Sequence, residues 1–256
     1  MQSLTDYLRR TVRTRRHLRR MTAFGAERAV TSIRSGLPEP AERVLVLAPH
    51  PDDETIGCGG TLAQLAARGS QIDVVFMTAG ARPGEAELEA QRKEEARAAA
   101  RVLRLRDVRF LGGHDGDLNR QRELSNALAQ LIGEGNYQVI FCPWPRDEHA
   151  DHQATYAILS DAAARSQCAE AELWLYEVWS PLPANRIVDI SSTMPTKMAA
   201  INSHRSQMRH KDYAGLARSL ARARARACGL PHTRYAEAFF VCAVGDLPDF
   251  ERSGAS

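Results

Sequence analysis

Short apolar runs alternate with stretches of helical periodicity over most of the chain. The runs, which we interpret as strands, are 43–48, 72–78, 108–111, 138–143 and 173–178. The helical stretches lie near 59–68, 85–104, 119–132 and 152–165. Runs that are apolar throughout are typical of strands buried on both faces. Strands that alternate with helices therefore predict an α/β, Rossmann-like fold, with a mostly parallel sheet and helices on both faces.

The pattern becomes mainly helical after residue 191. We expect helices over 192–208 and in the arginine-rich stretch that ends at residues 228–231 (CGLP), because a glycine followed by a proline stops a helix. A last strand is expected at 238–244. The clear break near the start is 36–40 (GLPEP), so the sequence divides into an N-terminal arm, residues 1–40, and one domain, residues 41–256, with a helical C-terminal portion.

The arm differs from the domain in charge. Residues 1–35 contain nine arginines against Asp6 and Glu27, a net charge of +7, whereas the whole chain has +3. Most of its apolar side chains share one half of a helical wheel, which Arg15 and Arg19 interrupt. A basic amphipathic helix can lie on an anionic membrane surface, which is one of the interpretations that the arm leaves open. The alternatives are a helix packed on its own domain or on a subunit partner, and a transit-type peptide.

Composition narrows the classes of protein. No apolar run approaches the ~20 residues of a membrane-spanning helix, and no secretory apolar segment opens the chain. The five cysteines form no CxxC pair and are expected to be thiols. We therefore expect a cytoplasmic protein, peripheral at the inner membrane face if the arm binds there. A nucleic-acid partner is not expected, because the arm has one tyrosine and the remainder is net acidic; homo-oligomerisation stays open.

The first strand, 43–48, runs into a loop that holds His50, Asp52, Asp53 and Glu54. Such a loop lies at the carboxyl edge of the sheet, where open α/β folds bind ligands. His50 and Asp53, three residues apart, are metal-ligand types, and Asp52 between them is then free to act as a base on bound water. The alternative is a helix start, in which Asp52 or Asp53 is the N-cap and Glu54 complements the helix dipole.

A second group follows the fourth strand, where residues 149–152 read His-Ala-Asp-His before a helix. In the common strand order 3-2-1-4-5, strands 1 and 4 are neighbours, so the two groups face each other across the crevice. His50, Asp53 and His152 would supply three ligands and leave a fourth position for water, as in catalytic zinc sites. Two histidines and a carboxylate also suit Fe²⁺, so the metal stays open. The alternative for 149–152 is an ordinary acidic helix start.

Together these residues resemble the PIG-L/LmbE-like deacetylase family, named for N-acetylglucosaminyl-phosphatidylinositol de-N-acetylase. The family motifs are His-Pro-Asp-Asp-Glu, here 50–54, and a later His-x-Asp-His, here 149–152. Further similar segments are 56–62 (IGCGGTL), 92–96 (RKEEA), 114–118 (HDGDL), 197–207 (KMAAINSHRSQ) and 235–239 (YAEAF). The resemblance covers roughly 42–244 and leaves the arm unmatched, so 41–256 is expected to be the deacetylase domain.

The resemblance implies zinc on His50, Asp53 and His152, with Asp52 as general base. It implies that His149 stabilises the oxyanion or acts as an acid, and that Asp151 supports it by orienting an imidazole.

Two further residues are candidates for substrate binding. Arg92 corresponds to a family arginine close to the site; its alternative is an ion pair with Glu95 on a solvated helix. Trp144 could stack on a sugar ring, ahead of Trp179, although aromatics at strand ends are usually packing residues. A capping or helix-packing role is favoured for His204.

The sequence therefore predicts a zinc-dependent N-deacetylase. Its expected substrate is an N-acetylated amino sugar, as part of a glycoconjugate or a glycolipid precursor of the N-acetylglucosamine type. The alternative within the same chemistry is an amidase that removes a larger acyl group from an amino-sugar conjugate.

Overall fold

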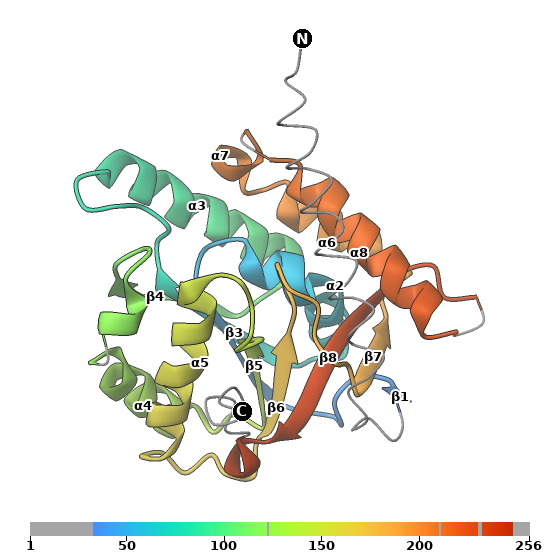
Figure 1. The fold of residues 1–256 in the computed structure, drawn as a ribbon, viewed down its shortest axis with the longest axis horizontal. Coiled ribbons are helices and arrows are strands. Elements are labelled where there is room, and N and C mark those ends of the chain that lie inside the picture. Colours follow the sequence, from blue (N-terminus) through green and yellow to red (C-terminus); the bar gives the residue numbers. More distant parts are fainter. Residues whose placement is uncertain (1–32, 122, 210, 230–231, 248–256) are drawn as a thin grey trace, which may run out of the picture.

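A single mixed sheet with helices on both faces organises the molecule (Figure 1). The computed structural model describes residues 33–121, 123–209, 211–229 and 232–247. The strands are β1 (Arg34–Ser35), β2 (Arg43–Ala48), β3 (Gln71–Thr78), β4 (Asp107–Gly113), β5 (Val139–Pro143), β6 (Glu172–Tyr176), β7 (Arg186–Asp189) and β8 (Ala236–Ala243). The longer helices are α2 (Asp53–Ala67), α3 (Ala86–Leu103), α4 (Leu124–Gly135), α5 (Ala150–Ala163), α6 (Met194–Ile201) and α8 (Tyr213–Ala227); α7 (Arg205–Met208) is a single turn.

The strand order confirms the expected arrangement and extends it. The order is β1-β7-β8-β6-β5-β2-β3-β4, so the five predicted strands 43–48 to 173–178 run 3-2-1-4-5 from β4 to β6, all parallel. The predicted last strand is β8, which pairs antiparallel with β6 and β7. The prediction missed β7 and β1, because β7 has four residues with charged ends and β1 has only two residues, which is too short to show a period.

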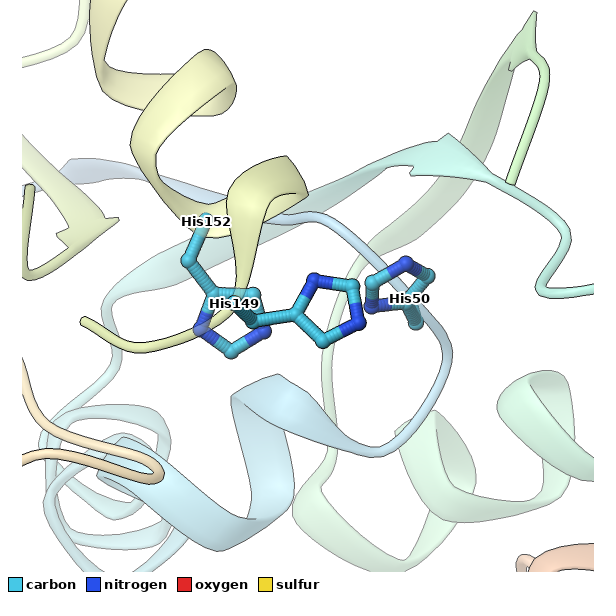
Figure 2. Close-up of side chains that lie close together, drawn as sticks. All are labelled: His50, His149 and His152. Atoms are coloured by element: carbon cyan, nitrogen blue, oxygen red, sulfur yellow. The ribbon is translucent and has the colours of Figure 1, made fainter. Parts of the chain in front are cut away.

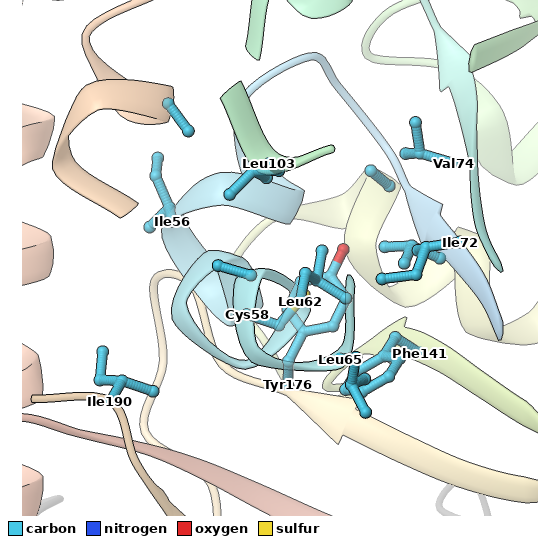
Figure 3. Packing of buried hydrophobic residues seen from close by; sticks show 14 of the residues in the cluster. Ile56, Cys58, Leu62, Leu65, Ile72, Val74, Leu103, Phe141, Tyr176 and Ile190 are labelled. Atoms are coloured by element: carbon cyan, nitrogen blue, oxygen red, sulfur yellow. The ribbon is translucent and has the colours of Figure 1, made fainter. Parts of the chain in front are cut away.

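Alternation along the strands divides the core into two layers. Val44 and Val46 face one layer with α2, α3, α6 and α8, whereas Leu45 and Leu47 face the other with α4 and α5. Figure 3 shows the first layer, in which apolar side chains of α2 pack on those of β3, β5 and β6. Burial of both faces explains why the strands read as continuous apolar runs.

Several helices differ from the sequence pattern at their ends. α2 begins at Asp53 instead of residue 59, because its first three residues are two acids and a threonine and its next four include two glycines, so no apolar period is visible there. The expected helix 192–208 is two helices, α6 and α7, with Asn202–His204 between them. Of the N-terminal arm, residues 1–32 lie outside the described residues. The residues that follow contribute β1 to the sheet and place Leu37 against the core.

Side chains from the C-terminal third hold α2 in place. Lys197 donates to the carbonyl of Ile56 at 2.7 Å and pairs with Glu237 at 2.5 Å. Glu237 also accepts from the backbone N–H groups of Gly60 and Thr61. A Cβ atom at Gly60 would come within 2.7 Å of Ile190, so this close approach requires glycine. The segments 197–207 and 235–239 therefore fix the helix that follows the first motif.

Candidate active site

The two predicted motifs meet at the carboxyl edge of the sheet. β2 and β5 are hydrogen-bonded neighbours; the loop after β2 carries His50, and the start of α5 carries His149 and His152. Figure 2 shows the three imidazoles grouped between these two segments, and their ligand atoms lie within 4.8 Å of one another. The topological switch point thus brings together residues that are about 100 positions apart in the sequence.

Two of the three predicted metal ligands, His50 and His152, lie close to a carboxylate oxygen of the third, Asp53. Asp53 Oδ2 lies 3.2 Å from His50 Nδ1 and 3.3 Å from His152 Nε2. Asp53 Oδ1 and both nitrogens of His152 are buried without a hydrogen-bond partner among the described residues. Buried polar atoms are nearly always partnered, so these atoms are suited to ligate an ion. Two imidazole nitrogens and a carboxylate form a donor set that fits a divalent transition metal.

Electrostatics at this site also fit a cation. Asp53 and His152 are both buried, and burial works against charge on each. The positive charge of His152, together with the hydrogen bond and charge of His50, nevertheless lowers the pKa of Asp53, and the negative charges of Asp53 and Asp147 raise the pKa of His152 to about 9. The imidazoles of His50 and His152 thus balance the negative charge of Asp53, and a bound cation would balance the same charge.

Asp52 has an unusual backbone. Its φ of +125° is a conformation that residues with side chains rarely adopt, and such strain is concentrated at functional sites. It precedes α2, yet within the described part of the chain its side chain caps nothing. The residue is 4% exposed; burial, together with Asp53 and Glu54, raises the pKa of its carboxyl group. The structure therefore does not support the capping alternative for Asp52.

His149 begins α5, and its Nδ1 accepts a hydrogen bond from the backbone N–H of Asp151 at 3.2 Å. An accepting Nδ1 places the proton of the neutral ring on Nε2, which is then a donor. Burial lowers the pKa of His149, and the positive charges of His50 and His152 lower it further. A neutral ring with a donating Nε2 can stabilise negative charge on a substrate oxygen. The helix-start alternative is also realised here, because the same side chain is the N-cap.

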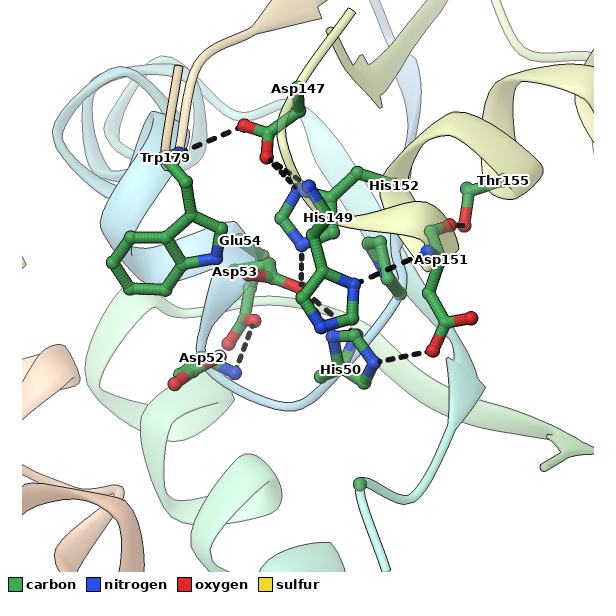
Figure 4. A network of polar contacts seen from close by, with 12 residues as sticks. His50, Asp52, Asp53, Glu54, Asp147, His149, Asp151, His152, Thr155 and Trp179 are labelled. Carbon is green, nitrogen blue, oxygen red and sulfur yellow. Dashed lines mark hydrogen bonds and ion pairs between the residues drawn. The ribbon is translucent and has the colours of Figure 1, made fainter. Parts of the chain in front are cut away.

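Asp151 holds His50 from the side opposite Asp53. Its Oδ2 lies 3.0 Å from His50 Nε2 (Figure 4). The Asp151 carboxylate also accepts from the backbone N–H groups of Gly116 and Leu118. Asp115 Oδ1 also lies 3.0 Å from His50 Nε2. A carboxylate behind a ligating histidine fixes its ring and tautomer. The sequence left open which imidazole Asp151 contacts. It did not single out Asp115 either, although Asp115 lies in segment 114–118, which resembles a family segment.

Asp147 is a second residue that the sequence analysis missed. Its Oδ1 lies 3.5 Å from His152 Nδ1, a charge contact rather than a tight hydrogen bond. Its Oδ2 accepts from the backbone N–H groups of Trp179 and Ser180 at 2.9 and 3.1 Å (Figure 4). The signal was available in the sequence, because Asp147 lies in the same loop as the second motif. It ties the segment after β6 to the histidine of that motif.

Arg92 lies near the site on α3. Its guanidinium approaches Gly80, where a Cβ atom would be within 2.6 Å of it. Its charge helps to lower the pKa of Asp115, after the larger effect of the His50 hydrogen bond. The ion-pair alternative with Glu95 is not what the structure shows, because Glu95 is buried and accepts from Gln91 and Ser206.

The positions of the two tryptophans differ from the expectation that Trp144, ahead of Trp179, stacks on a sugar ring. Trp144 is 3% exposed, and its ring packs 5.9 Å from that of Phe240 in the core layer that contains α4 and α5. This is the position of a packing residue, because large aromatics stabilise by burial. Trp179 is only half-buried, and its ring lies 5.4 Å from that of Tyr213. Figure 4 shows Trp179 beside the first motif.

The fold and the site define an open α/β protein with a candidate metal centre at its switch point. Residues 45–163 match the sequence profile of the PIG-L family, described as GlcNAc-PI de-N-acetylase. The chain therefore contains a PIG-L family domain, which confirms the resemblance seen in its motifs.

Similar proteins cover most of the domain. Diacetylchitobiose deacetylase of Thermococcus kodakarensis is 29% identical in an alignment 192 positions long, gaps included, which covers 65% of this chain and 70% of that protein. The 1D-myo-inositol 2-acetamido-2-deoxy-alpha-D-glucopyranoside deacetylase 1 of Saccharopolyspora erythraea is 28% identical in an alignment 238 positions long, gaps included, which covers 65% of this chain and 78% of that protein. The solved structure of N,N'-diacetylchitobiose deacetylase from Pyrococcus horikoshii superposes with a TM-score of 0.71 at 28% identity, covering 82% of this chain and 88% of that one.

Proposed function

We propose that the protein is a metal-dependent N-deacetylase, with zinc as the expected metal, that hydrolyses the acetamide of an N-acetylglucosamine-type glycoconjugate. The observation that carries this proposal is the convergence of His50 and His152 on Asp53 Oδ2, beside the buried Asp52. The PIG-L domain and the names of the similar deacetylases support the choice of an acetamide on a sugar.

His50, Asp53 and His152 would hold the metal ion. A divalent ion at such a site supplies Lewis acidity, which makes water a better nucleophile at neutral pH and polarises a carbonyl group. Asp115 and Asp151 behind His50, and Asp147 near His152, keep both imidazoles oriented.

The remaining residues of the motifs move or stabilise charge. Asp52 accepts a proton from the attacking water, because it is adjacent to the ligand Asp53 and its carboxyl group caps nothing. His149 donates a hydrogen bond from Nε2 to the amide oxygen as that oxygen gains negative charge. The proton held by Asp52 then serves the departing nitrogen, so the products are acetate and a free amine. We propose that Arg92, whose charge acts on Asp115, binds a polar group of the substrate.

The test is a primary-amine release assay on a panel of N-acetylglucosaminyl compounds, with metal content measured on the same sample. The panel includes N-propionyl and N-butyryl analogues of one sugar. Faster release from the acetylated compound supports a deacetylase, whereas faster release from the longer acyl groups supports an amidase. Amine release from none of these compounds by the metal-loaded protein would falsify the proposal. Elemental analysis distinguishes zinc from Fe²⁺.

We further propose that the basic arm contacts an anionic membrane surface, where a lipid-linked substrate would be found. The support is its charge of +7 over residues 1–35. No helix among the described residues is long and apolar enough to cross a membrane. Deletion of residues 1–32 spares β1, and it is expected to reduce co-sedimentation with phosphatidylserine vesicles at low salt. Unchanged co-sedimentation would favour the packed-helix alternative.

A further inference from the structure

Glu54 is a buried acid of the first motif that the proposed reaction does not use. Its side chain is on the first turn of α2, and the residue is 1% exposed. Its Oε2 accepts a hydrogen bond from the backbone N–H of Asp52 at 3.1 Å, as Figure 4 shows. Its Oε1 lies 3.4 Å from Nε2 of His204. Helix-dipole stabilisation accounts for an acid in the first turn but not for its complete burial.

The backbone of Asp52 needs such a contact. A residue with a side chain at φ +125° is strained, and such a conformation persists only where the surrounding structure holds it. The carbonyl of Asp52 accepts from Thr55 Oγ1 at 2.7 Å and from the Thr55 N–H at 3.0 Å. Glu54 holds the N–H on the other side. Both peptide groups of Asp52 are thus fixed, while its carboxyl group is left without a capping role.

His204 supports Glu54 from a distant part of the chain. It is fully buried between α6 and α7, and both its ring nitrogens lack a hydrogen-bond partner of good geometry among the described residues. The carboxylate of Glu54 faces the ring of His204. Ser206, two residues on, donates its N–H and its hydroxyl to Glu95 of α3. This anchor keeps His204 in place behind Glu54.

We infer that Glu54 is a positioning residue for Asp52, and that His204 acts through it. Glu54 holds the strained peptide of Asp52, and this fixes where the carboxyl group of the base points. His204 orients the carboxylate of Glu54. The inference rests on the proposed function, because it assigns Asp52 the role of base. It explains why a histidine of segment 197–207 and the last acid of the first motif are buried together.

The experiment measures kcat, KM and metal content for Glu54→Leu, Glu54→Gln and His204→Leu, beside wild type and Asp52→Asn. Glu54→Leu removes the acceptor and is expected to lower kcat about 10²-fold, the effect of a misplacement near 1 Å, with KM and metal content little changed. Glu54→Gln keeps an oxygen for the Asp52 N–H and should restore most of the lost kcat. His204→Leu should cost less than Glu54→Leu, and the double variant should be no worse than Glu54→Leu alone, because one acts through the other.

The matched control is Asp73→Asn, which changes a buried carboxylate at the opposite end of the sheet. If Asp73→Asn and the Glu54 variants lose similar stability but only the Glu54 variants lose kcat, the loss of kcat is not a consequence of lower stability. If wild type and Asp52→Asn behave as proposed but Glu54→Leu retains its kcat, or Glu54→Gln rescues nothing, the inference fails and the proposed function stands. If Asp52→Asn is itself fully active, the role of the base fails first. His204→Leu tests the same contacts should Glu54→Leu not fold.

Discussion

Buried carboxylates lie at both ends of the parallel sheet, and their surroundings shift their pKa values in opposite directions. At the amino end, Asp73 of β3 is 1% exposed and accepts from Arg106 Nε and Tyr137 Oη, each at 2.7 Å. Burial alone would raise its pKa, but the hydrogen bonds from Arg106 and Tyr137 lower it. At the carboxyl end, Asp52 is 4% exposed, and burial and the neighbouring acids raise its pKa.

The difference separates structural acids from functional ones. Asp73 has cationic and hydroxyl donors and lies within a regular strand, so its charge contributes to stability. Asp52 lies in a strained turn, and Asp53 keeps an unpartnered oxygen among the described residues. Groups left in this state cost stability and are retained where a ligand or a reaction uses them. Burial of an acid therefore does not by itself distinguish a structural role from a functional one; the hydrogen-bond partners of the carboxylate do.

The largest expected effect is loss of the metal. His152→Ala removes a fully buried ligand nitrogen, so metal occupancy should drop and activity should fall to the background rate. Asp53→Ala should behave in the same way, because it removes the oxygen on which both imidazoles converge. Elemental analysis of each purified variant is the measurement. Full occupancy in both variants would show that the metal, if any, is held elsewhere.

Next in size is the loss of the base with the metal retained. Asp52→Asn is nearly isosteric and should keep its metal, while kcat falls roughly 10²–10⁴-fold, the range for loss of general acid–base catalysis. His149→Ala should also retain metal, with kcat falling more than KM changes, because its hydrogen bond strengthens in the transition state. Steady-state kinetics at one pH, normalised to bound metal, measure both. A metal-depleted Asp52→Asn protein would mean that Asp52 is a ligand.

A smaller effect, on stability alone, is expected at the amino end. Asp73→Asn leaves the hydrogen-bonding groups of Arg106 and Tyr137 poorly matched and should lower the free energy of unfolding by about 1–3 kcal/mol. The value of kcat per bound metal should not change, because Asp73 lies at the edge of the sheet opposite the site. Urea denaturation and the amine assay on the same preparation check the two halves of this prediction. A fall in kcat would break the comparison between the two ends.

The smallest effect is a pH dependence of that stability difference. The pKa of Asp73 is lowered in the folded state, so its contribution is present above the unfolded pKa of about 4 and is lost as pH falls through the folded value. The gap in stability between wild type and Asp73→Asn should therefore be widest near neutral pH and shrink below pH ~4. Urea denaturation of both proteins across this range is the measurement. A gap that widens on acidification contradicts the lowered pKa.

Local sequence pattern determined much of the architecture. The apolar runs predicted the five parallel strands, because burial on both faces leaves few polar positions in the inner strands, whereas the edge strand β4 is only partly buried. The order of those strands and the motif spacing then placed His50 and His152 at one edge, as found. Short elements such as β7, and the early start of α2, left no periodic signal and were missed.

Only the tertiary structure decided which side chains contact one another there. Asp147 and Asp115 lie within or beside recognised motif segments, but their contacts could not be read from the sequence; folding placed them 3.5 Å from His152 and 3.0 Å from His50, respectively. The same holds for Trp144, a core residue, and for Glu54 and His204, which are 150 positions apart. The physical reason is that residue type and period fix which face of an element is apolar, whereas contacts between polar groups depend on how distant elements pack.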